Sequence, residues 1–220
     1  MKEILTIPHL LAKAEEFCAI QSRYANPSLY GVTDGKAVGT YVEHAFQKFI
    51  SDAYEIQIGS SAKGIDLPSE DINTDIKVTS IKQPQSSCPF KSPREKVYGL
   101  GYNLLLFVYD KKDNPVTQTT QLDFISCAFI DKKRTGDYQT TKGIRQILDN
   151  NGNVDDLIGF FYDKNLPGDE IIFQGLAEEI LENRPKQGYL TISNALQWRL
   201  QYKRIVDTPK NSVKGIVKII

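Results

Sequence analysis

The sequence predicts an α/β fold with a central mixed β-sheet flanked by helices and a helical elaboration toward the C-terminus. Three observations carry this prediction: a strongly amphipathic helical segment near the start, a group of strand patterns in the middle, and helical patterns that dominate the last third. The length of 220 residues suits one domain, 1–220, with a core at about 37–130 and a helical region at about 140–206.

Two helices are predicted before the strands. Residues 8–22 place apolar side chains near helical spacing, and a proline at position 8 suits a helix start. Residues 24–36 are rich in turn residues and predict a loop. Residues 38–54 carry the most continuous apolar stripe of the chain. At about 100° per residue, Glu43 lies at the edge of that stripe, beside the face that packs on the sheet.

Strand patterns occupy the middle of the chain. Gly64–Pro68 is a short strand candidate, and residues 72–81 alternate polar and apolar side chains. Residues 102–109 and 121–130 predict neighbouring strands, the first buried on both faces. The stretch 82–99, rich in proline, serine and lysine, predicts a loop with a short helical piece near its end.

Helical patterns dominate the remainder of the chain. Each predicted segment repeats apolar residues at helical spacing, and together they cover about residues 141–149, 154–163, 169–182 and 191–206. Because helices both precede and follow the strands, we expect the sheet to lie between helices.

Composition excludes several classes of protein. Hydrophobic residues make up 40% and charged residues 25%, and no apolar run approaches the roughly 20 residues of a membrane helix. The N-terminal segment lacks the features of a secretory signal. Cys18, Cys88 and Cys127 are odd in number and widely spaced, which argues against a disulfide framework or a zinc cluster. We therefore expect a cytoplasmic protein that does not associate with membranes.

Charge is balanced overall but sorted along the chain. The 27 basic and 27 acidic side chains cancel. Segments 76–112, 132–145 and 184–220 carry net charges of +5, +4 and +7, whereas 146–183 carries −8. If the basic segments converge in space, they form a groove for phosphates. The alternative is the ordinary fluctuation of charge on a solvated surface.

The most informative pattern joins Asp66 to an Asp-x-Lys pair at Asp75 and Lys77. Because side chains alternate along a strand, Asp75 and Lys77 share one face, and a neighbouring strand can present Asp66 on the same side. Two carboxylates and waters suit Mg²⁺. The lysine can orient or help deprotonate a water and stabilise developing negative charge. Glu43 supplies a third carboxylate if its helix packs beside the strands.

Two observations weigh against this interpretation. An exposed charged face on an antiparallel strand pair would produce the same alternation without any metal chemistry. The Asp-x-Lys spacing also recurs at Asp110 and Lys112 and at Asp131 and Lys133. Each recurrence follows an apolar strand, where a solvated turn is the simpler explanation, and neither has an upstream acidic residue at the right spacing.

The arrangement resembles the active site of the PD-(D/E)xK nuclease superfamily, specifically of type II restriction endonucleases. In that family a helix with a glutamate precedes the sheet, one strand carries a metal-binding aspartate, and the next carries the (D/E)xK pair. The resemblance covers roughly residues 37–130. It implies that Asp66, Asp75 and Glu43 bind metal, with Lys77 as the lysine, and that the core is restriction-endonuclease-like. The chain departs from the pattern in having Pro68 after the first acid and aspartate as the second.

Polar residues beyond the predicted site suggest DNA contacts. Glutamine can bond adenine edges and arginine can bond guanine, whereas serine and lysine suit phosphates. The alternative is that each residue belongs to a flexible polar loop. The candidates are Gln83, Gln85, Ser86, Lys91, Arg94, Lys132, Lys133 and Arg134.

The resemblance implies a Mg²⁺-dependent, sequence-specific type II endonuclease that hydrolyses phosphodiester bonds of double-stranded DNA. We expect a homodimer, because two-fold symmetric DNA sites call for two-fold protein symmetry. The acidic segment 146–183 is a candidate dimerisation or insertion element. Two alternatives remain open at this point: a DNA repair or junction-resolving nuclease on the same core, and a noncatalytic DNA-binding protein.

Overall fold

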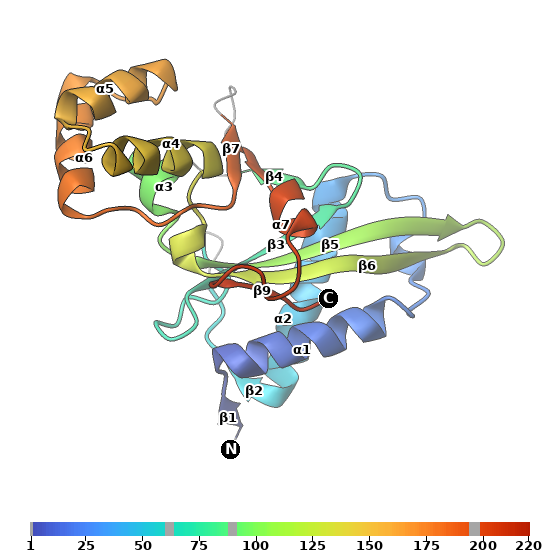
Figure 1. Cartoon of the computed structure of the whole chain (residues 1–220). Helices are drawn as coiled ribbons and strands as arrows, with labels where there is room; N and C mark the ends of the chain where they lie inside the picture. Colours follow the sequence, from blue (N-terminus) through green and yellow to red (C-terminus); the bar gives the residue numbers. More distant parts are fainter. Residues whose placement is uncertain (1, 60–63, 88–91, 194–198) are drawn as a thin grey trace. The chain divides into compact units, whose positions relative to one another are not determined.

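The computed structural model describes residues 2–59, 64–87, 92–193 and 199–220 (Figure 1). The chain forms two compact units. Unit 1 comprises residues 1–86, 102–130 and 208–220, and unit 2 comprises 87–101 and 131–207. Most of the predicted core falls in unit 1, and the predicted helical region falls entirely in unit 2.

Unit 1 begins with the two predicted helices. Helix α1 (Ile7–Gln21) starts after Thr6, whose side chain accepts a hydrogen bond from a backbone N–H of the first turn. Helix α2 (Gly35–Ala53) starts after Asp34, which caps it in the same way. The short 3₁₀ helix η1 (Pro27–Leu29) lies within the predicted loop. The buried stripe of α2 is the one expected from the sequence, namely Val38, Val42, Phe46 and Ile50.

A four-stranded mixed sheet forms the centre of unit 1. Its strand order is β3 (Thr74–Ser80), β5 (Asn103–Asn114), β6 (Thr119–Ile130) and β9 (Ile216–Lys218). β3 pairs with β5 in parallel, and the other two pairings are antiparallel. The α/β class with a mixed central sheet is confirmed. The first seven residues of β5 are all buried, as predicted for residues 102–109.

An aromatic cluster packs both helices against this sheet. α1 contacts β6 and α2 contacts β3. Phe46 of α2 lies 5.0 Å from Phe107 of β5 and 5.2 Å from Phe17 of α1, measured between ring centroids. Burying a side chain of this size stabilises the fold by about 1.5–3 kcal/mol. The cluster therefore fixes α2 firmly against the sheet, with Glu43 three residues before Phe46.

Unit 2 is mainly helical. Its core gathers side chains such as Leu157, Phe161, Phe173 and Leu176. The predicted helices at about 141–149, 154–163 and 169–182 are confirmed, as is the short helix near its predicted position before residue 99. The elements are α3 (Arg94–Tyr98), η2 (Lys132–Arg134), α4 (Tyr138–Asp149), α5 (Val154–Asp163), α6 (Glu170–Glu182), β7 (Thr191–Ser193), β8 (Arg199–Gln201) and α7 (Lys203–Asp207).

The predicted helix over 191–206 is wrong. β7 and β8 form an antiparallel pair, and among the described residues of this stretch only α7 is helical. The reason is visible in the burial: Leu190, Ile192, Leu200 and Tyr202 are buried, and the residues between them within each strand are more exposed. This is the period of two expected for strands, not the period of a helix. The basic residues of this region therefore do not share one helical face.

The predicted strand at Gly64–Pro68 is also wrong. This segment makes a single antiparallel bridge, between Leu67 and Thr74, and is otherwise a loop. Pro68 has no backbone N–H to extend the pairing, and Gly64 adopts a positive φ of 67° that interrupts an extended chain.

Three short strands complete the described elements. β1 (Glu3–Ile4) pairs in parallel with β2 (Tyr54–Glu55), and β4 (Gln85–Ser87) follows β3 along the chain. In the part of the chain that the structure describes, no helix has the length and apolar character to cross a membrane.

Candidate active site

Strand β3 carries two of the predicted catalytic residues. Asp75 and Lys77 lie two residues apart, so their side chains project to the same side of the strand. Lys77 Nζ is 2.7 Å from Asp75 Oδ2. The Asp75 side chain is 4% exposed and the Lys77 side chain 23% exposed. The pair therefore sits largely out of water, where charge interactions are strong.

Asp66 reaches the same strand from the preceding loop. Leu67 and Thr74 exchange two backbone hydrogen bonds of 3.0 Å, which fold the loop back onto the start of β3. The backbone N–H of Ile76 then donates to Asp66 Oδ2 at 2.7 Å. This N–H is available because β3 is the edge strand of its sheet. Asp66 and Asp75 are thus brought together although the loop is not a strand.

Asn103, at the start of β5, holds this loop in shape. Its side-chain Nδ2 donates to the carbonyl of Ile72 at 2.9 Å, and its backbone N–H donates to the carbonyl of Asn73 at 2.8 Å. Asn73 has a positive φ of 36°, a conformation that asparagine tolerates better than most residues. The sequence analysis gave Asn103 no role. A polar residue at the head of a strand expected to be buried is the signal that marks it.

Glu43 approaches from helix α2. Its pKa is raised to about 7, chiefly by burial, then by the charge of Asp66 and a hydrogen bond with that side chain. The attraction of Lys77 opposes this rise. Glu43 is therefore close enough to both residues to interact with them. The helix edge predicted from the apolar stripe therefore faces Asp66 and Lys77.

Asp75 is buried, and its surroundings disfavour the charged form of its carboxylate. Its pKa is raised to about 7, chiefly by burial, and the attraction of Lys77 opposes that rise. A hydrogen bond with Asp66 and the charge of Asp66 are smaller contributions to the same rise. Asp75 Oδ2 is paired with Lys77 by distance, yet it accepts no hydrogen bond of favourable angle from the described residues. Even with the Lys77 ammonium 2.7 Å away, burial keeps the charged form of this carboxylate disfavoured.

The carboxylates fit a hard divalent cation. Within the described ranges, no three His, Cys, Asp or Glu side chains converge into a complete metal cage. Mg²⁺ does not require one, because it is commonly held by one or two carboxylates and retains several waters. Asp66 and Asp75 provide that donor set, and the undersatisfied Oδ2 of Asp75 suits a cation. Glu43 adds a third acidic group beside Asp66.

The two other Asp-x-Lys pairs are accounted for by local structure. Lys112 Nζ lies 2.6 Å from Asp123 Oδ2 and 3.8 Å from Asp110 Oδ2, so it bridges the β5–β6 hairpin. The solvated turn expected at residues 110–112 is wrong, because β5 continues to Asn114. At the other pair, Asp131 caps η2 by accepting the N–H of Lys133 at 2.8 Å. The side chains of Asp110 and Asp123 are 29% and 26% exposed, whereas that of Asp75 is 4% exposed, so the hairpin acids are not buried as Asp75 is.

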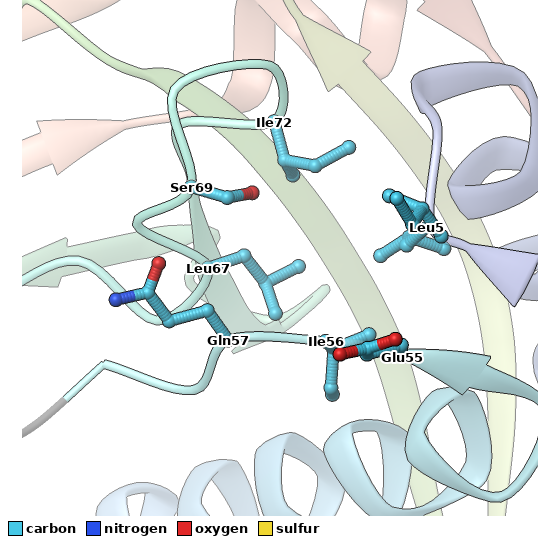
Figure 2. A pocket seen from close by; sticks show the side chains of 8 residues that line it. Leu5, Glu55, Ile56, Gln57, Leu67, Ser69 and Ile72 are labelled. Carbon is cyan, nitrogen blue, oxygen red and sulfur yellow. The ribbon is translucent and has the colours of Figure 1, made fainter. Parts of the chain in front are cut away.

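A small pocket lies behind the loop that carries Asp66 (Figure 2). Its volume is about 280 Å³, and its lining is mostly apolar, with Leu5, Ile56, Leu67 and Ile72 among its walls. None of the four predicted catalytic residues, all of which the structure describes, is part of that lining. The pocket therefore lies against the loop that follows Asp66 and not against the candidate catalytic side chains.

The predicted DNA contacts lie in both units. In unit 1, Gln83, Gln85 and Ser86 follow β3 directly, with Gln83 exposed and the other two half-buried. In unit 2, Lys132 and Lys133 are exposed on η2. Arg134 is held by two contacts: its Nη1 donates to the carbonyl of Gln187, and its guanidinium lies 5.8 Å from the ring of Tyr189. Lys91 lies outside the described residues.

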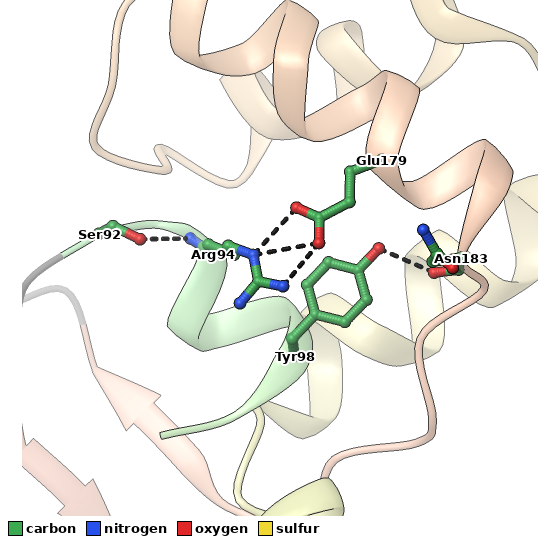
Figure 3. Close-up of polar contacts among 5 residues, drawn as sticks. All are labelled: Ser92, Arg94, Tyr98, Glu179 and Asn183. Carbon is green, nitrogen blue, oxygen red and sulfur yellow. Dashed lines mark hydrogen bonds and ion pairs between the residues drawn. The ribbon is translucent and has the colours of Figure 1, made fainter. Parts of the chain in front are cut away.

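Arg94 makes a two-pronged contact with Glu179 (Figure 3). Its Nε and Nη2 donate to the carboxylate at 2.9 Å and 2.6 Å. The guanidinium also lies 4.7 Å from the ring of Tyr98, whose hydroxyl donates to the carbonyl of Asn183 at 2.7 Å. A contact between Arg94 and guanine would therefore compete with the Glu179 pair.

Comparison with known proteins shows that this chain is similar in sequence to type II restriction enzymes. The sequence profile "Type II restriction enzyme NspV" matches residues 4–218. The chain is also 56% identical over 204 residues to the type II restriction enzyme NspV of Nostoc sp. (strain ATCC 29411 / PCC 7524). That alignment covers 93% of this chain and 92% of the relative.

Proposed function

Because this chain belongs to the NspV family of type II restriction enzymes, we propose that it hydrolyses phosphodiester bonds of double-stranded DNA with Mg²⁺ at the Asp66, Asp75 and Lys77 cluster. Family membership confirms the type II restriction endonuclease predicted from the sequence. It favours that function over a repair nuclease or a noncatalytic DNA-binding protein. The observation that carries the proposed site is the buried Asp75 carboxylate, which lies beside Lys77 and Asp66 in surroundings that disfavour its charge.

In the proposed mechanism the acidic residues receive the metal. Asp66 and Asp75 would hold Mg²⁺, with Glu43 as a further ligand or as a hydrogen-bonding partner of a coordinated water. When bound, the metal polarises the scissile phosphate and lowers the pKa of a coordinated water. Burial is the main cause of the raised pKa values of Glu43 and Asp75, and the charge of Asp66 adds to it, so a cation held beside these groups would favour their charged forms.

Lys77 is proposed to act on the reacting groups. Its ammonium already lies 2.7 Å from Asp75 Oδ2, so little movement is needed to place it beside a phosphate at the same carboxylate. There it would donate hydrogen bonds that orient the attacking water and stabilise negative charge developing on the phosphate oxygens. Its limited exposure strengthens this interaction, because few waters compete for the ammonium.

DNA recognition is proposed to use the polar residues that follow β3. Gln83 and Gln85 have the donor and acceptor groups that bond adenine edges, and Ser86 suits a phosphate. The basic residues supply further contacts, Lys132 and Lys133 to phosphates and Arg94 to guanine once it is released from Glu179. Lys91 and Arg134 complete the proposed set.

A homodimer is the proposed working form, because a two-fold symmetric DNA site matches a two-fold symmetric protein. Within the acidic 146–183 segment, the apolar side chains of Ile171, Tyr162 and Ile172 are 83%, 54% and 46% exposed. These residues make the segment a candidate dimerisation element.

Both described cysteines, Cys18 and Cys127, are free thiols, in keeping with the expected cytoplasmic location.

A cleavage assay tests the proposed function. The protein is incubated with a sequenced plasmid in Mg²⁺, and the products are mapped. Discrete fragments that share one sequence at their ends are expected. Nicks at mismatches or cuts confined to branched junctions would favour the repair function, and binding without cleavage in every divalent metal would leave only the DNA-binding one.

A further inference from the structure

We infer that Thr79 determines cleavage specificity by holding the Gln83–Gln85 loop, whose last residue is the first of β4, against the strand that carries Asp75 and Lys77. Thr79 is the third residue of the polar side of β3, after Asp75 and Lys77, and it is 6% exposed. It touches neither metal nor DNA in this proposal and so acts as a positioning residue. The inference rests on the proposed function, because it assumes that the loop contacts DNA.

A single hydroxyl holds three backbone groups of the loop. Thr79 Oγ1 lies 3.1 Å from the carbonyl of Gln83 and 3.1 Å from the carbonyl of Gln85, and it accepts the N–H of Gln85 at 3.1 Å. The hydroxyl has one proton, which the two carbonyls share, and its lone pairs serve the N–H. The loop backbone is therefore organised around one buried side chain.

Other contacts shape the same turn. The N–H of Ile81 donates to the carbonyl of Tyr109 at 2.8 Å, which extends the pairing of β3 with β5. The N–H of Gln83 donates to the carbonyl of Ser80 at 3.3 Å, and the N–H of Gln85 to the carbonyl of Gln83 at 2.8 Å. These bonds hold the loop locally, whereas the Thr79 hydroxyl is a side-chain link from the catalytic strand to both glutamines.

Loss of the Thr79 contacts should affect the discrimination between base pairs more than the hydrolysis step. Base contacts discriminate only when the side chains are held in register with the edges they bond. A loop released from Thr79 could still reach DNA through Gln83 and Gln85, but it would accept altered base pairs more readily. Asp75 and Lys77 would keep their own contact, so cleavage at the correct site should persist.

The test compares Thr79→Val with the wild-type enzyme. Valine has the same shape as threonine, favours strands and lacks the hydroxyl. The cognate site is first mapped from wild-type cleavage, and cleavage rates are then measured at that site and at each single-base variant of it. Thr79→Val should lower the preference for the cognate site roughly tenfold, within the range of one lost base contact. Its rate at the cognate site should stay close to wild type.

Two further variants separate this role from a general loss of stability. Thr120→Val is the matched control, because Thr120 is a fully buried threonine whose Oγ1 donates to Asp113 in the hairpin of the same unit. It should keep wild-type specificity. Thr79→Ser keeps the hydroxyl and should restore discrimination. If Thr79→Val does not fold, Thr79→Cys replaces it, since a thiol is a weak hydrogen-bonding group; discrimination equal to that of Thr79→Ser would overturn the inference.

The glutamines distinguish failure of this inference from failure of the proposed DNA contacts. If Gln83→Ala or Gln85→Ala relaxes specificity but a folded Thr79→Val does not, the clamp is wrong and the contacts stand. If neither glutamine variant nor Thr79→Val alters specificity, both are wrong. Relaxed specificity in Thr79→Val and in a glutamine variant supports the clamp as the device that places those side chains.

Discussion

Two aspartates, one in each unit, are almost equally buried but differ in how their oxygens are satisfied. Asp75 of unit 1 is 3% exposed and Asp137 of unit 2 is 5% exposed. In Asp137, Oδ1 accepts the N–H of Thr140 and Oδ2 accepts the N–H of Ile192, both at 2.8 Å. In Asp75, Oδ2 lacks a hydrogen bond of good geometry among the described residues, and burial outweighs the help of Lys77.

This difference separates a structural carboxylate from a candidate catalytic one. Asp137 caps α4 and ties it to β7, so both of its oxygens work for the fold. Asp75 is held in a site that disfavours its charge, which costs stability unless a cation arrives. Strongly shifted pKa values of this kind gather at functional sites. Burial alone would have ranked the two residues alike.

The largest expected effect is on cleavage. Lys77→Ala should lower the cleavage rate by at least roughly 10³-fold, because it removes the cation proposed to stabilise developing charge. Asp66→Ala and Asp75→Ala should lose metal-dependent activity similarly. Single-turnover cleavage in Mg²⁺ measures the loss, and DNA binding in Ca²⁺ should remain measurable. Lys112→Ala is the control, since its Asp-x-Lys pair is an exposed hairpin contact; full activity in Lys77→Ala would remove the catalytic assignment.

The second prediction concerns the structural aspartate. Asp137→Ala removes two hydrogen bonds to a buried carboxylate, one of which caps α4, so the free energy of unfolding should fall by about 2–4 kcal/mol. Urea unfolding followed by circular dichroism measures this change. Asp75→Asn should show no such fall when metal is absent. Equal destabilisation by both variants would contradict the distinction between the two sites.

The third prediction sharpens the comparison through pH. The pKa of Asp75 is raised to about 7, so the folded state binds its proton more tightly than the unfolded state does. Protonated Asp75 therefore contributes fully to the free energy of unfolding below the ordinary carboxyl pKa of about 4, and this contribution is lost as the pH rises toward 7. Without metal, Asp75→Asn should therefore be more stable than wild type at pH 8, by roughly 1–2 kcal/mol.

Thermal melting between pH 4 and 8 checks this prediction. Added Mg²⁺ should stabilise the wild-type protein at pH 8 and have little effect on Asp75→Asn, because the metal binds the charged carboxylate. If the melting temperatures of the two proteins changed with pH in parallel, the surroundings of Asp75 would not disfavour its charged form.

The smallest expected effect is at Arg94. The pair with Glu179 is exposed, so Arg94→Ala should change the free energy of unfolding by less than about 1 kcal/mol. Its proposed guanine contact predicts a larger effect on DNA binding, about 1–3 kcal/mol at the cognate site. Glu179→Gln should slightly strengthen binding by freeing the guanidinium. Salt-matched binding measurements in Ca²⁺ decide between a recognition residue and a purely structural one.

Local pattern was sufficient for most of the elements that surround the site. The apolar stripe of α2 and the alternation of β3 each repeat over many residues, so packing on the sheet has one consistent solution. The last predicted helix failed because residues 191–206 contain two short strands separated by residues outside the described structure. Three-residue strands such as β7 and β8 give too few repeats to distinguish a period of two from a helical one.

The site itself was predicted in part. The residue types and order of Glu43, Asp66, Asp75 and Lys77 pointed to metal-dependent phosphodiester chemistry, and the structure brings them together as contacts. The route differs from the one expected, since Asp66 arrives on a loop. Asn103 lies on the neighbouring strand β5, 30 positions after Asn73, and holds that loop in shape. Its polar character at the head of a buried strand marks it in the sequence, but no local pattern shows which loop it contacts.

The sequence by itself determined the α/β class, the order of the main elements and the kinds of side chain available for chemistry, because these follow from periodicity and residue type. Only the tertiary structure decided which carboxylate has both oxygens hydrogen-bonded to backbone N–H groups and which is buried where its charge is disfavoured. Asp75 and Asp137 are the same residue, and what distinguishes them is the set of N–H groups and charges that distant segments bring within hydrogen-bonding distance. That set depends on how the whole chain packs.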